Sequence, residues 1–201
     1  MHLPDRVDVV IVGGGVMGAS AAFHLAEVGV SVLLCEKNEL ASGSTSKAAG
    51  GVRANFSDEF NVALGARSLD LFSNFINRPG YEIDLHRPGY LFALTKPEDV
   101  ALFERSTEIH HQFGVASRMI SPSEAKKISP LLHTDDLLAA SFTPNDGHCT
   151  PEAVVLGYAG AAKKLGATVL TGVEVTGINH RDGEITSVTT SAGNVATNTV
   201  I

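Results

Sequence analysis

The chain has few cysteines, no long apolar run and no recognisable signal peptide. Its two cysteines, Cys35 and Cys149, do not form a disulfide framework, which indicates a reducing compartment. No apolar run approaches the roughly 20 residues that span a bilayer. The N-terminus lacks the charged region, apolar core and cleavage site of a signal peptide. We therefore expect a cytoplasmic protein without a transmembrane segment.

Positive charge and metal-ligand spacing are also scarce. Lysine and arginine total 15 against 22 aspartates and glutamates, and the formal net charge is −7. Without a basic cluster, nucleic acid is not expected as the main partner. The eight histidines show no spacing of the H-x-x-x-H kind, so no metal site is predicted. The 44% hydrophobic and 18% charged residues are those of a folded globular chain.

Apolar periodicity predicts alternating strands and helices. Strands are expected at 8–12, 31–35, 135–143, 167–171, 173–180, 184–190 and 194–201, and a turn followed by a strand is expected within 87–95. Helices are expected at 16–28, 58–77, 97–113, 121–127 and 151–165. The predicted apolar side of the second helix consists of Phe60, Ala63, Leu64, Leu71, Phe72 and Phe75. The first strand, helix and second strand predict a parallel βαβ unit, and the last three strands predict an antiparallel meander.

The stretch VVIVGGGVMGAS joins the first strand to the first helix through a glycine-rich turn. It matches G-x-G-x-x-G at Gly13, Gly15 and Gly18. Gly13 permits the tight turn, Gly15 lets the backbone approach a pyrophosphate, and Gly18 lets the helix pack closely on the strand. The pyrophosphate of a dinucleotide is therefore expected at the helix N-terminus, where unpaired N–H groups favour anions.

Two further features narrow the choice of dinucleotide. Glu36, at the end of the second strand, can accept hydrogen bonds from ribose hydroxyls but would repel a 2′-phosphate, so NADP is disfavoured. An NAD domain would normally continue with another helix and strand of the same sheet. This chain continues instead with ASGSTSKAAGGVR, whose hydroxyl and backbone groups can hydrogen-bond an extended ligand. That loop favours FAD.

The combination of DVVIVGGGVMGASAAFHLAEVGVSVLLCEK and SGSTSKAAGGVR resembles the glycine/D-amino acid oxidase (DAO) family of FAD-dependent oxidoreductases. The resemblance is greatest to the group of the sarcosine oxidase β-subunit and dimethylglycine dehydrogenase. RPGYLFAL and TPNDGHCTPEAVVLGYAGAAKKLGATVLTGVEVTGI are similar to the same family in the same order. The implied fold class is α/β, with a Rossmann-like FAD/NAD(P)-binding domain of parallel sheet and antiparallel β-meander. Part of an α+β substrate domain is inserted in it.

The resemblance also implies how the chain is divided. Residues 1–80 and 149–201 would form the FAD-binding domain, and residues 81–148 would form part of the substrate domain. Family members run to nearly twice this length. The chain is therefore expected to be an N-terminal portion that is completed by a C-terminal half or by a partner subunit.

A set of FAD-binding residues follows from the same resemblance. Gly13, Gly15 and Gly18 would hold the pyrophosphate, Glu36 the adenosine ribose, and the backbone of Val175 the adenine. Other residues are implied in the glycine turn, beside the ribose and along the path to the flavin. They are Val16, Met17, Lys37, Ser44, Thr45, Ala49, Gly50 and Gly51. Some relatives attach the flavin covalently to a histidine at the position of Lys47, so non-covalent FAD is expected here.

The implied chemistry is removal of a hydride equivalent from a C–H bond beside an amine, which gives an imine. Sarcosine, dimethylglycine, glycine or a D-amino acid would be the substrate, and the flavin carries the chemistry. Arg53 is the catalytic candidate. It could bind a substrate carboxylate or stabilise charge on reduced flavin, or it could equally be a surface or phosphate-binding arginine. Tyr90 is either a pocket residue or a core residue, and Asp146-Gly147 is predicted as a turn.

Two other functions stay open on the residues alone. One is an oxidoreductase that uses NAD in place of flavin. The other is a non-catalytic nucleotide-binding subunit that needs a partner chain. The sequence does not specify the electron acceptor, whether oxygen, a quinone or another carrier.

Overall fold

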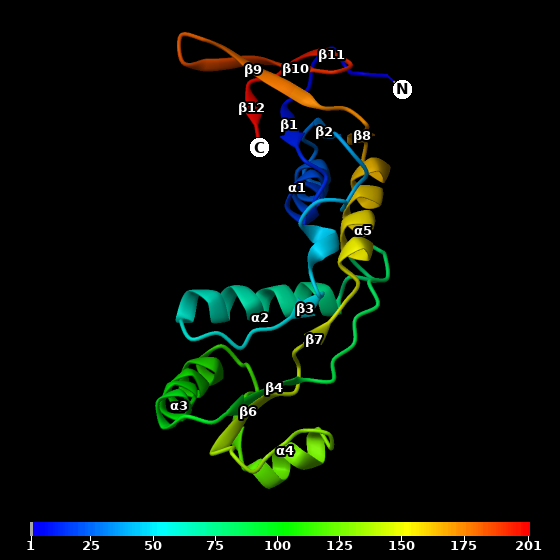
Figure 1. The fold of residues 1–201 in the computed structure, drawn as a ribbon. Coiled ribbons are helices and arrows are strands. Elements are labelled where there is room, and N and C mark those ends of the chain that lie inside the picture. The colour runs from blue at the N-terminus through cyan, green and yellow to red at the C-terminus, as the bar shows by residue number, and fades with distance from the viewer. Residues whose placement is uncertain (1) are drawn as a thin grey trace. The chain divides into compact units, whose positions relative to one another are not determined.

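The computed structural model describes residues 2–201, which form two compact units. Unit 1 comprises residues 2–49, 75–83 and 150–201, and unit 2 comprises residues 50–74 and 84–149. Each unit has its own sheets and helices (Figure 1). No helix of the part of the chain that the structure describes has the length and apolar character needed to cross a membrane.

Unit 1 contains a parallel sheet, a meander and two long helices. Its elements are β1 (Val9–Val12), α1 (Val16–Glu27), β2 (Val32–Glu36), the short 3-10 helix η1 (Thr45–Lys47), α5 (Pro151–Lys164), β8 (Thr168–Thr171), β9 (Val175–Arg181), β10 (Glu184–Thr190), β11 (Gly193–Ala196) and β12 (Thr199–Val200). The parallel sheet has the strand order β12-β1-β2-β8, and the antiparallel meander has the order β11-β10-β9. This arrangement confirms the predicted α/β fold class.

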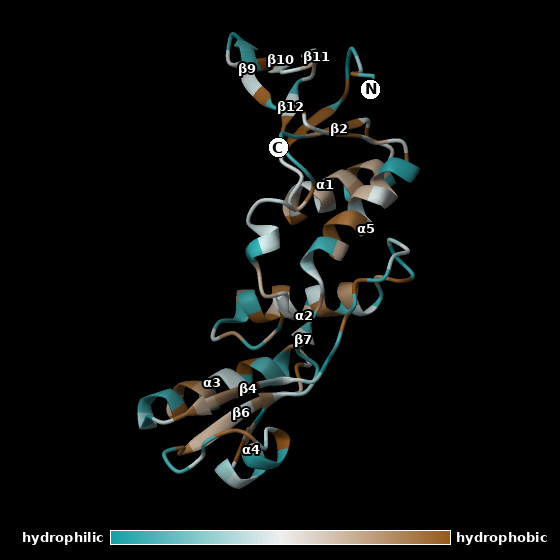
Figure 2. Ribbon diagram, turned by 45° about the vertical axis from the view of Figure 1, so that its right-hand side comes forward, coloured by the Kyte–Doolittle hydropathy of each residue, from teal (hydrophilic) through white to brown (hydrophobic). Residues whose placement is uncertain are grey.

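The parallel sheet of unit 1 is covered on both faces. On one face Val10 and Leu33 pack with Val188 and Val195 of the meander. On the other face α1 and α5 lie side by side, and β1 contacts α1 through Ile11. Strands covered in this way are apolar on both sides, and β1 and β2 are accordingly brown in Figure 2. Burying each large aliphatic side chain stabilises the fold by at most about 1.5–3 kcal/mol.

One strand prediction in unit 1 needs correction. The predicted strand at 194–201 is in fact two strands, β11 and β12. β11 pairs with β10 in the meander, whereas β12 pairs with β1 in the parallel sheet. The change of sheet occurs at Thr197, whose hydroxyl donates to the Asp8 carbonyl at 3.0 Å. The apolar pattern continues through this change because both strands are covered by the same core.

Unit 2 combines a small antiparallel sheet with three helices. Its elements are β3 (Gly51–Val52), α2 (Glu59–Ser73), β4 (Tyr90–Leu94), α3 (Pro97–Gln112), β5 (Arg118–Ile120), α4 (Pro122–Ile128), β6 (Ala139–Thr143) and β7 (Gly147–His148). The sheet has the order β4-β6-β5, and β3 pairs with β7. The strand β5 was not predicted, because three residues are too few to show a period. A small apolar core forms where Ile120, Ala125 and Ala140 pack together.

The buried side of α2 matches the predicted one only in part: Phe75, just beyond the helix, is buried, and Leu71 and Phe72 are half-buried. Val62, Gly65 and Leu69 are buried, whereas Phe60 and Leu64 are 75% and 53% exposed. A Cβ at Gly65 would lie 2.9 Å from the Ala54 Cα, so glycine allows the helix backbone to approach its neighbour on this side. The side of α2 that is buried is therefore the side on which its backbone can approach Ala54. Hydropathy does not reveal this fit.

The two compact units are bounded differently from the predicted segments, and residues 81–83, predicted within the substrate domain, lie in unit 1. Residues 50–74 belong to unit 2, not with the first FAD-binding segment, because α2 packs against α3 of that unit. The second boundary lies at 149/150, beside the predicted 148/149. Whether the two units serve FAD and substrate respectively stays a prediction.

Candidate functional site

The three predicted glycines form the turn between β1 and α1. Gly13 has a positive φ of 111°, a conformation that L side chains rarely adopt. A Cβ at Gly18 would lie 2.0 Å from the Gly13 carbonyl oxygen, so only glycine lets α1 pack this closely on β1. A Cβ at Gly15 would lie 3.5 Å from Thr45 Oγ1 and meet nothing else within 4 Å. The absence of a side chain at Gly15 therefore leaves free space beside the turn for a ligand.

The N-terminus of α1 carries no negative charge of its own. Among the five α-helices within residues 2–201, α1 alone has neither a side-chain cap nor an acidic residue in its first turn. Gly15 is the N-cap residue, and the Val16 N–H donates to the Thr45 hydroxyl at 3.3 Å. Because a helix N-terminus attracts anions, this end of α1 suits a pyrophosphate group.

The carboxylate of Glu36 reaches from the end of β2 back to the glycine turn. The Gly14 N–H donates to Oε2 at 2.7 Å, and the Asn38 N–H donates to Oε1 at 2.8 Å. A Cβ at Gly14 would lie 2.9 Å from the Glu36 Cβ, which explains why the middle residue of GGG is also glycine. Each carboxylate oxygen keeps a further lone pair, as the predicted contact with ribose hydroxyls requires.

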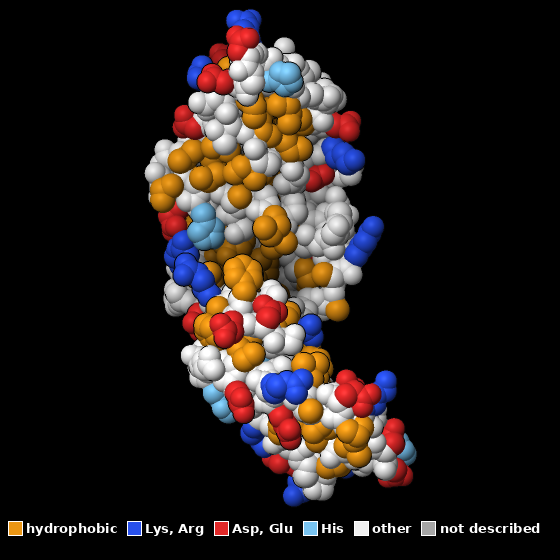
Figure 3. Space-filling view, turned by 90° about the vertical axis from the view of Figure 1, so that its left-hand side faces the viewer, with side chains coloured by type: hydrophobic (Ala, Val, Ile, Leu, Met, Phe, Trp, Pro, Cys, Tyr) orange, Lys and Arg blue, Asp and Glu red, His pale blue; other side chains and the backbone are white. Residues whose placement is uncertain are grey.

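A cleft of about 400 Å³ lies over this turn in unit 1. The predicted FAD-binding residues that line it are Gly13, Gly15, Val16, Met17, Gly18, Glu36, Lys37, Ser44 and Thr45. Apolar side chains in this lining face solvent, since Met17 is 82% exposed and Val12 is 47% exposed. Hydrophobic side chains also gather in patches on the face of unit 1 seen in Figure 3.

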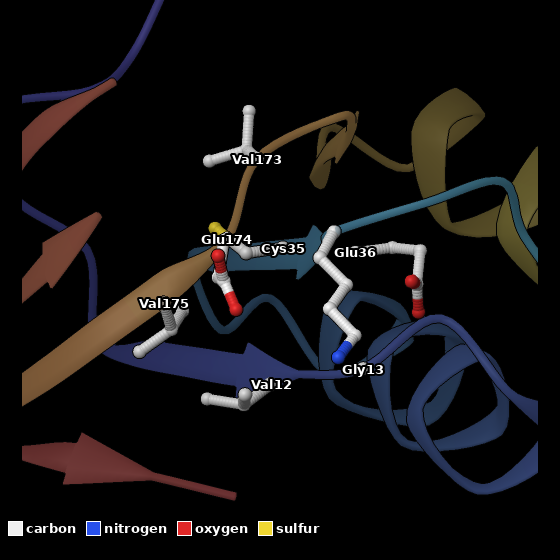
Figure 4. A pocket seen from close by; sticks show the side chains of 8 residues that line it. Val12, Gly13, Cys35, Glu36, Val173, Glu174 and Val175 are labelled. Atoms are coloured by element: carbon white, nitrogen blue, oxygen red, sulfur yellow. The ribbon is translucent and has the colours of Figure 1, made fainter. Parts of the chain in front are cut away.

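A second pocket of about 250 Å³ shares Gly13, Glu36 and Lys37 with this cleft. Figure 4 shows that the ends of β1 and β2 and the segment leading into β9 surround it. That segment is tied to β2 because the Val173 N–H donates to the Glu36 carbonyl at 3.0 Å. Val175, the predicted adenine residue, lines the pocket and pairs with Thr190 in the meander. The structure thus brings Val175 next to the glycine turn, although 157 or more residues separate them in sequence (175 − 18 = 157).

The last predicted cofactor residues, Ala49, Gly50 and Gly51, do not line either pocket. Ala49 ends the first segment of unit 1, and the glycine pair begins unit 2. Gly50 has a positive φ of 77°, and a Cβ at Gly51 would lie 2.1 Å from the Tyr90 hydroxyl oxygen. A left-handed turn and a close contact inside unit 2 therefore explain the two glycines. Their contact with the flavin stays a prediction.

Arg53 lies against three aromatic rings of unit 2. Its Cζ is 5.1 Å from the ring centroid of Phe56, 5.9 Å from that of Tyr90 and 5.6 Å from that of Phe92. The side chain is half-buried, and no carboxylate lies within 4 Å of its guanidinium nitrogens in the described chain. Arg53 is thus a positioned cation whose N–H donors remain available to an anionic ligand. Tyr90 is both a partner of Arg53 and a packing residue.

The two thiols do not form a reactive site. Cys35 and Cys149 are buried and unpaired. Burial raises the pKa of the Cys35 thiol to about 11, and burial together with the Asp84 charge raises the pKa of Cys149. Both thiols stay protonated at neutral pH, and the thiolate is the nucleophilic form. No group of three His, Cys, Asp or Glu that could hold a metal ion occurs in residues 2–201.

Several residues of interest were missed by sequence reasoning. Gly14 was one, although the middle glycine of GGG was a usable signal. Glu174 lies in the second pocket beside Val175 (Figure 4), and no local pattern marked it. Asp146 was assigned to a turn, but the turn is at 144–145 and Asp146 is fully buried. His110 is also fully buried and accepts or donates two hydrogen bonds.

Known proteins are similar to this chain over nearly its whole length. The profile of the DAO family, described as FAD dependent oxidoreductase, matches residues 8–201. The chain is 32% identical to mitochondrial dimethylglycine dehydrogenase of Rattus norvegicus, over 98% of this chain and 23% of that protein. It is 28% identical to sarcosine oxidase subunit beta of Rhodobacter capsulatus, over 94% of this chain and 47% of that protein.

A solved structure gives the same result for the fold. L-proline dehydrogenase from P. horikoshii superposes with a TM-score of 0.93 and 38% identity, over 98% of this chain and 52% of that one. The chain therefore spans about half the length of that structure and about a quarter of the rat enzyme.

The residues present fit FAD. The uncapped N-terminus of α1, the space beside Gly15 and the carboxylate of Glu36 provide for a pyrophosphate and a ribose without a 2′-phosphate. The second pocket adds room for the base. With the family profile matching nearly from end to end, this chain belongs to the DAO family of FAD-dependent oxidoreductases.

Proposed function

We propose that the protein carrying this chain oxidises the C–N bond of a secondary amine or amino acid to an imine, with non-covalent FAD. The observation that supports this most is the combination of the dinucleotide site in unit 1 with the unpaired Arg53 in unit 2. The relatives named above act, by their names, on dimethylglycine, sarcosine and L-proline. All three are amino acids with a substituted nitrogen, so sarcosine-like and dimethylglycine-like molecules are the first candidates, followed by glycine and D-amino acids.

The residues of unit 1 would bind and orient the cofactor. Gly15 gives the pyrophosphate access to the α1 N-terminus, Glu36 accepts from the ribose hydroxyls, and the backbone of Val175 holds the adenine. Lys37, Ser44 and Thr45 supply further donors along the same cleft. FAD, when bound, supplies the hydride acceptor. Lys47, at the place where some relatives carry a histidine, supports a non-covalent attachment.

The proposed role of Arg53 is to bind the carboxylate of the substrate. A guanidinium presents parallel N–H donors that match a carboxylate. The rings of Phe56, Tyr90 and Phe92 hold the side chain by cation–π contact, which reduces the entropy lost on binding. They also present an apolar surface to the methyl or methylene groups of the amine.

The proposal is tested on the full-length protein that carries this chain. Purified under gentle conditions, it should be yellow, with flavin bands near ~450 and ~370 nm that bleach anaerobically when a substrate amine is added. Precipitation with acid should release the flavin into solution, as non-covalent attachment requires. A full-length protein that stays colourless and cannot be reconstituted with FAD would refute the proposed function.

Arg53→Lys provides the matched variant for the carboxylate. It keeps the positive charge but loses the paired donors, so KM for a carboxylate-bearing amine should rise roughly tenfold or more. The flavin spectrum should stay unchanged, because no part of the flavin site is altered. An unchanged KM would exclude Arg53 from substrate binding while leaving the flavin assignment intact.

A non-catalytic or partner-dependent subunit is the second candidate. The name of the Rhodobacter capsulatus relative, subunit beta of sarcosine oxidase, supports it. Activity that appears only after a second chain is added would favour this candidate.

The cytoplasmic location is likewise a proposal, supported by two buried thiols that stay unpaired. The electron acceptor, oxygen or another carrier, is to be found by comparing oxygen with quinones and redox dyes in the same assay.

A further inference from the structure

Residues 54–56, which directly follow Arg53, are held by buried side chains from three distant parts of unit 2. The Ala54 N–H donates to Asp146 Oδ1 at 3.0 Å. The Asn55 side-chain amide donates to Thr143 Oγ1 at 2.8 Å. The Phe56 carbonyl lies 2.7 Å from Nε2 of His110. We call residues 54–56 the clamped segment, because each of its three residues has a separate buried partner.

His110 is buried, and burial lowers the pKa of its imidazole, so the neutral ring faces the clamped segment. A carbonyl oxygen can only accept, so Nε2 must carry the proton that it shares with Phe56. Nδ1 then accepts from the Ser117 hydroxyl at 2.6 Å. His110 is fully buried, and both of its ring nitrogens are used. The ring therefore has one tautomer and one orientation, and it fixes Phe56, whose ring lies under Arg53.

Burying the Asp146 side chain destabilises the fold more than burying His110 does. Its side chain is fully buried, and its Oδ2 has no hydrogen-bond partner among the residues that the structure describes. Burial raises the pKa of the Asp146 carboxyl, and the N–H groups of residues 54 and 55 and the charges of Arg53 and Arg87 offset this only in part. A buried polar atom without a partner destabilises a fold, and a neutral acceptor would hold the Ala54 N–H equally well. Such unfavourable groups are typical of functional sites, where geometry matters more than stability.

We propose that Asp146 and His110 are positioning residues for Arg53: by fixing the clamped segment they hold the guanidinium over its three rings, directed at the substrate carboxylate. This inference rests on the proposed function. Neither residue touches the substrate. Each acts through the backbone on one side of Arg53, Asp146 at the adjacent residue and His110 two residues further on.

The experiment uses the full-length protein with two readouts. The first is the Nε–H resonance of Arg53 in arginine-labelled protein, identified by its loss in Arg53→Lys. Ring currents from Phe56, Tyr90 and Phe92 should shift it away from the position of exposed arginines. The second is competitive inhibition by acetate, a carboxylate without an amine, together with kcat and KM for the amine that the enzyme oxidises.

His110→Leu and Asp146→Ala remove the two contacts. In both variants the Arg53 resonance should move to the position of exposed arginines. The inhibition constant of acetate and the KM of the amine should rise roughly ten- to hundredfold, with kcat changed much less. His110→Gln and Asp146→Asn should restore most of both signals, because a glutamine amide can donate to the Phe56 carbonyl and an asparagine carbonyl can accept from the Ala54 N–H.

Ile120→Ala is the matched control. Ile120 is buried in the separate apolar core of unit 2, so this variant loses stability without touching the clamped segment, and both readouts should stay as in the wild type. If His110→Leu or Asp146→Ala is folded and leaves both readouts unchanged, the inference is wrong. If Asp146→Ala does not fold, the comparison of His110→Leu with His110→Gln is sufficient to test the inference. If Arg53→Lys leaves acetate inhibition unchanged, the proposed carboxylate role fails first, whatever the resonance shows.

Discussion

At the scale of single residues, the glycines of the β1–α1 turn have different physical roles. Gly18 is required by the protein itself, because a Cβ there would meet the Gly13 carbonyl at 2.0 Å. Gly15 is not required by packing, because its nearest neighbour would be the Thr45 hydroxyl at 3.5 Å. We therefore expect Gly18 to serve the packing of α1 and Gly15 to leave room for the ligand.

This difference gives a paired prediction. Gly18→Ala should lower the free energy of unfolding by about 1–3 kcal/mol, because the added methyl overpacks the helix–strand contact. Gly15→Ala should lower it by no more than about 1 kcal/mol, yet weaken FAD roughly tenfold or more, because the methyl occupies the approach to the pyrophosphate. Urea unfolding of the apoprotein and flavin titration measure the two effects. Equal losses of stability in both variants would contradict the separate roles.

At the scale of elements, α2 shows how a helix chooses its buried face. Its sequence offers apolar residues on more than one side. The side that is buried contains Val62, Gly65 and Leu69, and the glycine lets the helix backbone approach Ala54. The sequence predicted the helix itself, because apolar spacing and the capping residue Asp58 are local signals. It predicted the buried side only in part, because the fit between two backbones depends on a segment from elsewhere.

Leu69 and Leu64 provide a test within this one helix. Leu69 is 5% exposed, so Leu69→Ala should lower the free energy of unfolding by about 2–5 kcal/mol through lost burial and a cavity. Leu64 lies on the exposed side, so Leu64→Ala should change it by no more than about 0.5 kcal/mol. Denaturant unfolding of the two variants compares the same substitution in two environments. If Leu64→Ala lowered the free energy of unfolding more than Leu69→Ala, the side of the helix predicted from hydropathy would be the buried one.

At the scale of the whole molecule, the residues proposed to bind the adenosine diphosphate half of FAD all lie in unit 1. The glycine turn, Glu36 and Val175 line two neighbouring pockets of that unit. Arg53 and the clamped segment lie in unit 2. Cofactor recognition and the proposed carboxylate recognition are thus assigned to different units.

ADP should therefore bind the flavin-free protein without help from the flavin ring. At a concentration 100-fold above its Kd, ADP should add about 2.7 kcal/mol to the free energy of unfolding and raise Tm. ADP with an additional 2′-phosphate should give a much smaller rise, because Glu36 repels it. Thermal unfolding with each nucleotide measures this preference, and Glu36→Gln should reduce it. Equal stabilisation by the two nucleotides in the wild type would show that Glu36 does not face the ribose.

The sequence by itself determined the features that depend on near neighbours. The glycine turn, the strand before it, the helix after it and the acidic residue at the end of β2 all lie between residues 8 and 36. Their spacing follows from the local contacts that each of them makes. Together with the loop SGSTSKAAGGVR and the later similar segments, they were sufficient to predict the family and the fold.

Only the tertiary structure decided which rings Arg53 contacts and what holds the segment that follows it. The partners of the clamped segment are 92, 88 and 54 residues away along the chain, and hydrogen bonds at such separations leave no period or motif in the sequence. Asp146 looked like a turn residue because Asp-Gly is common in turns. Its burial follows from the packing of β6, β7 and α3 around residues 54–56, which no local pattern specifies.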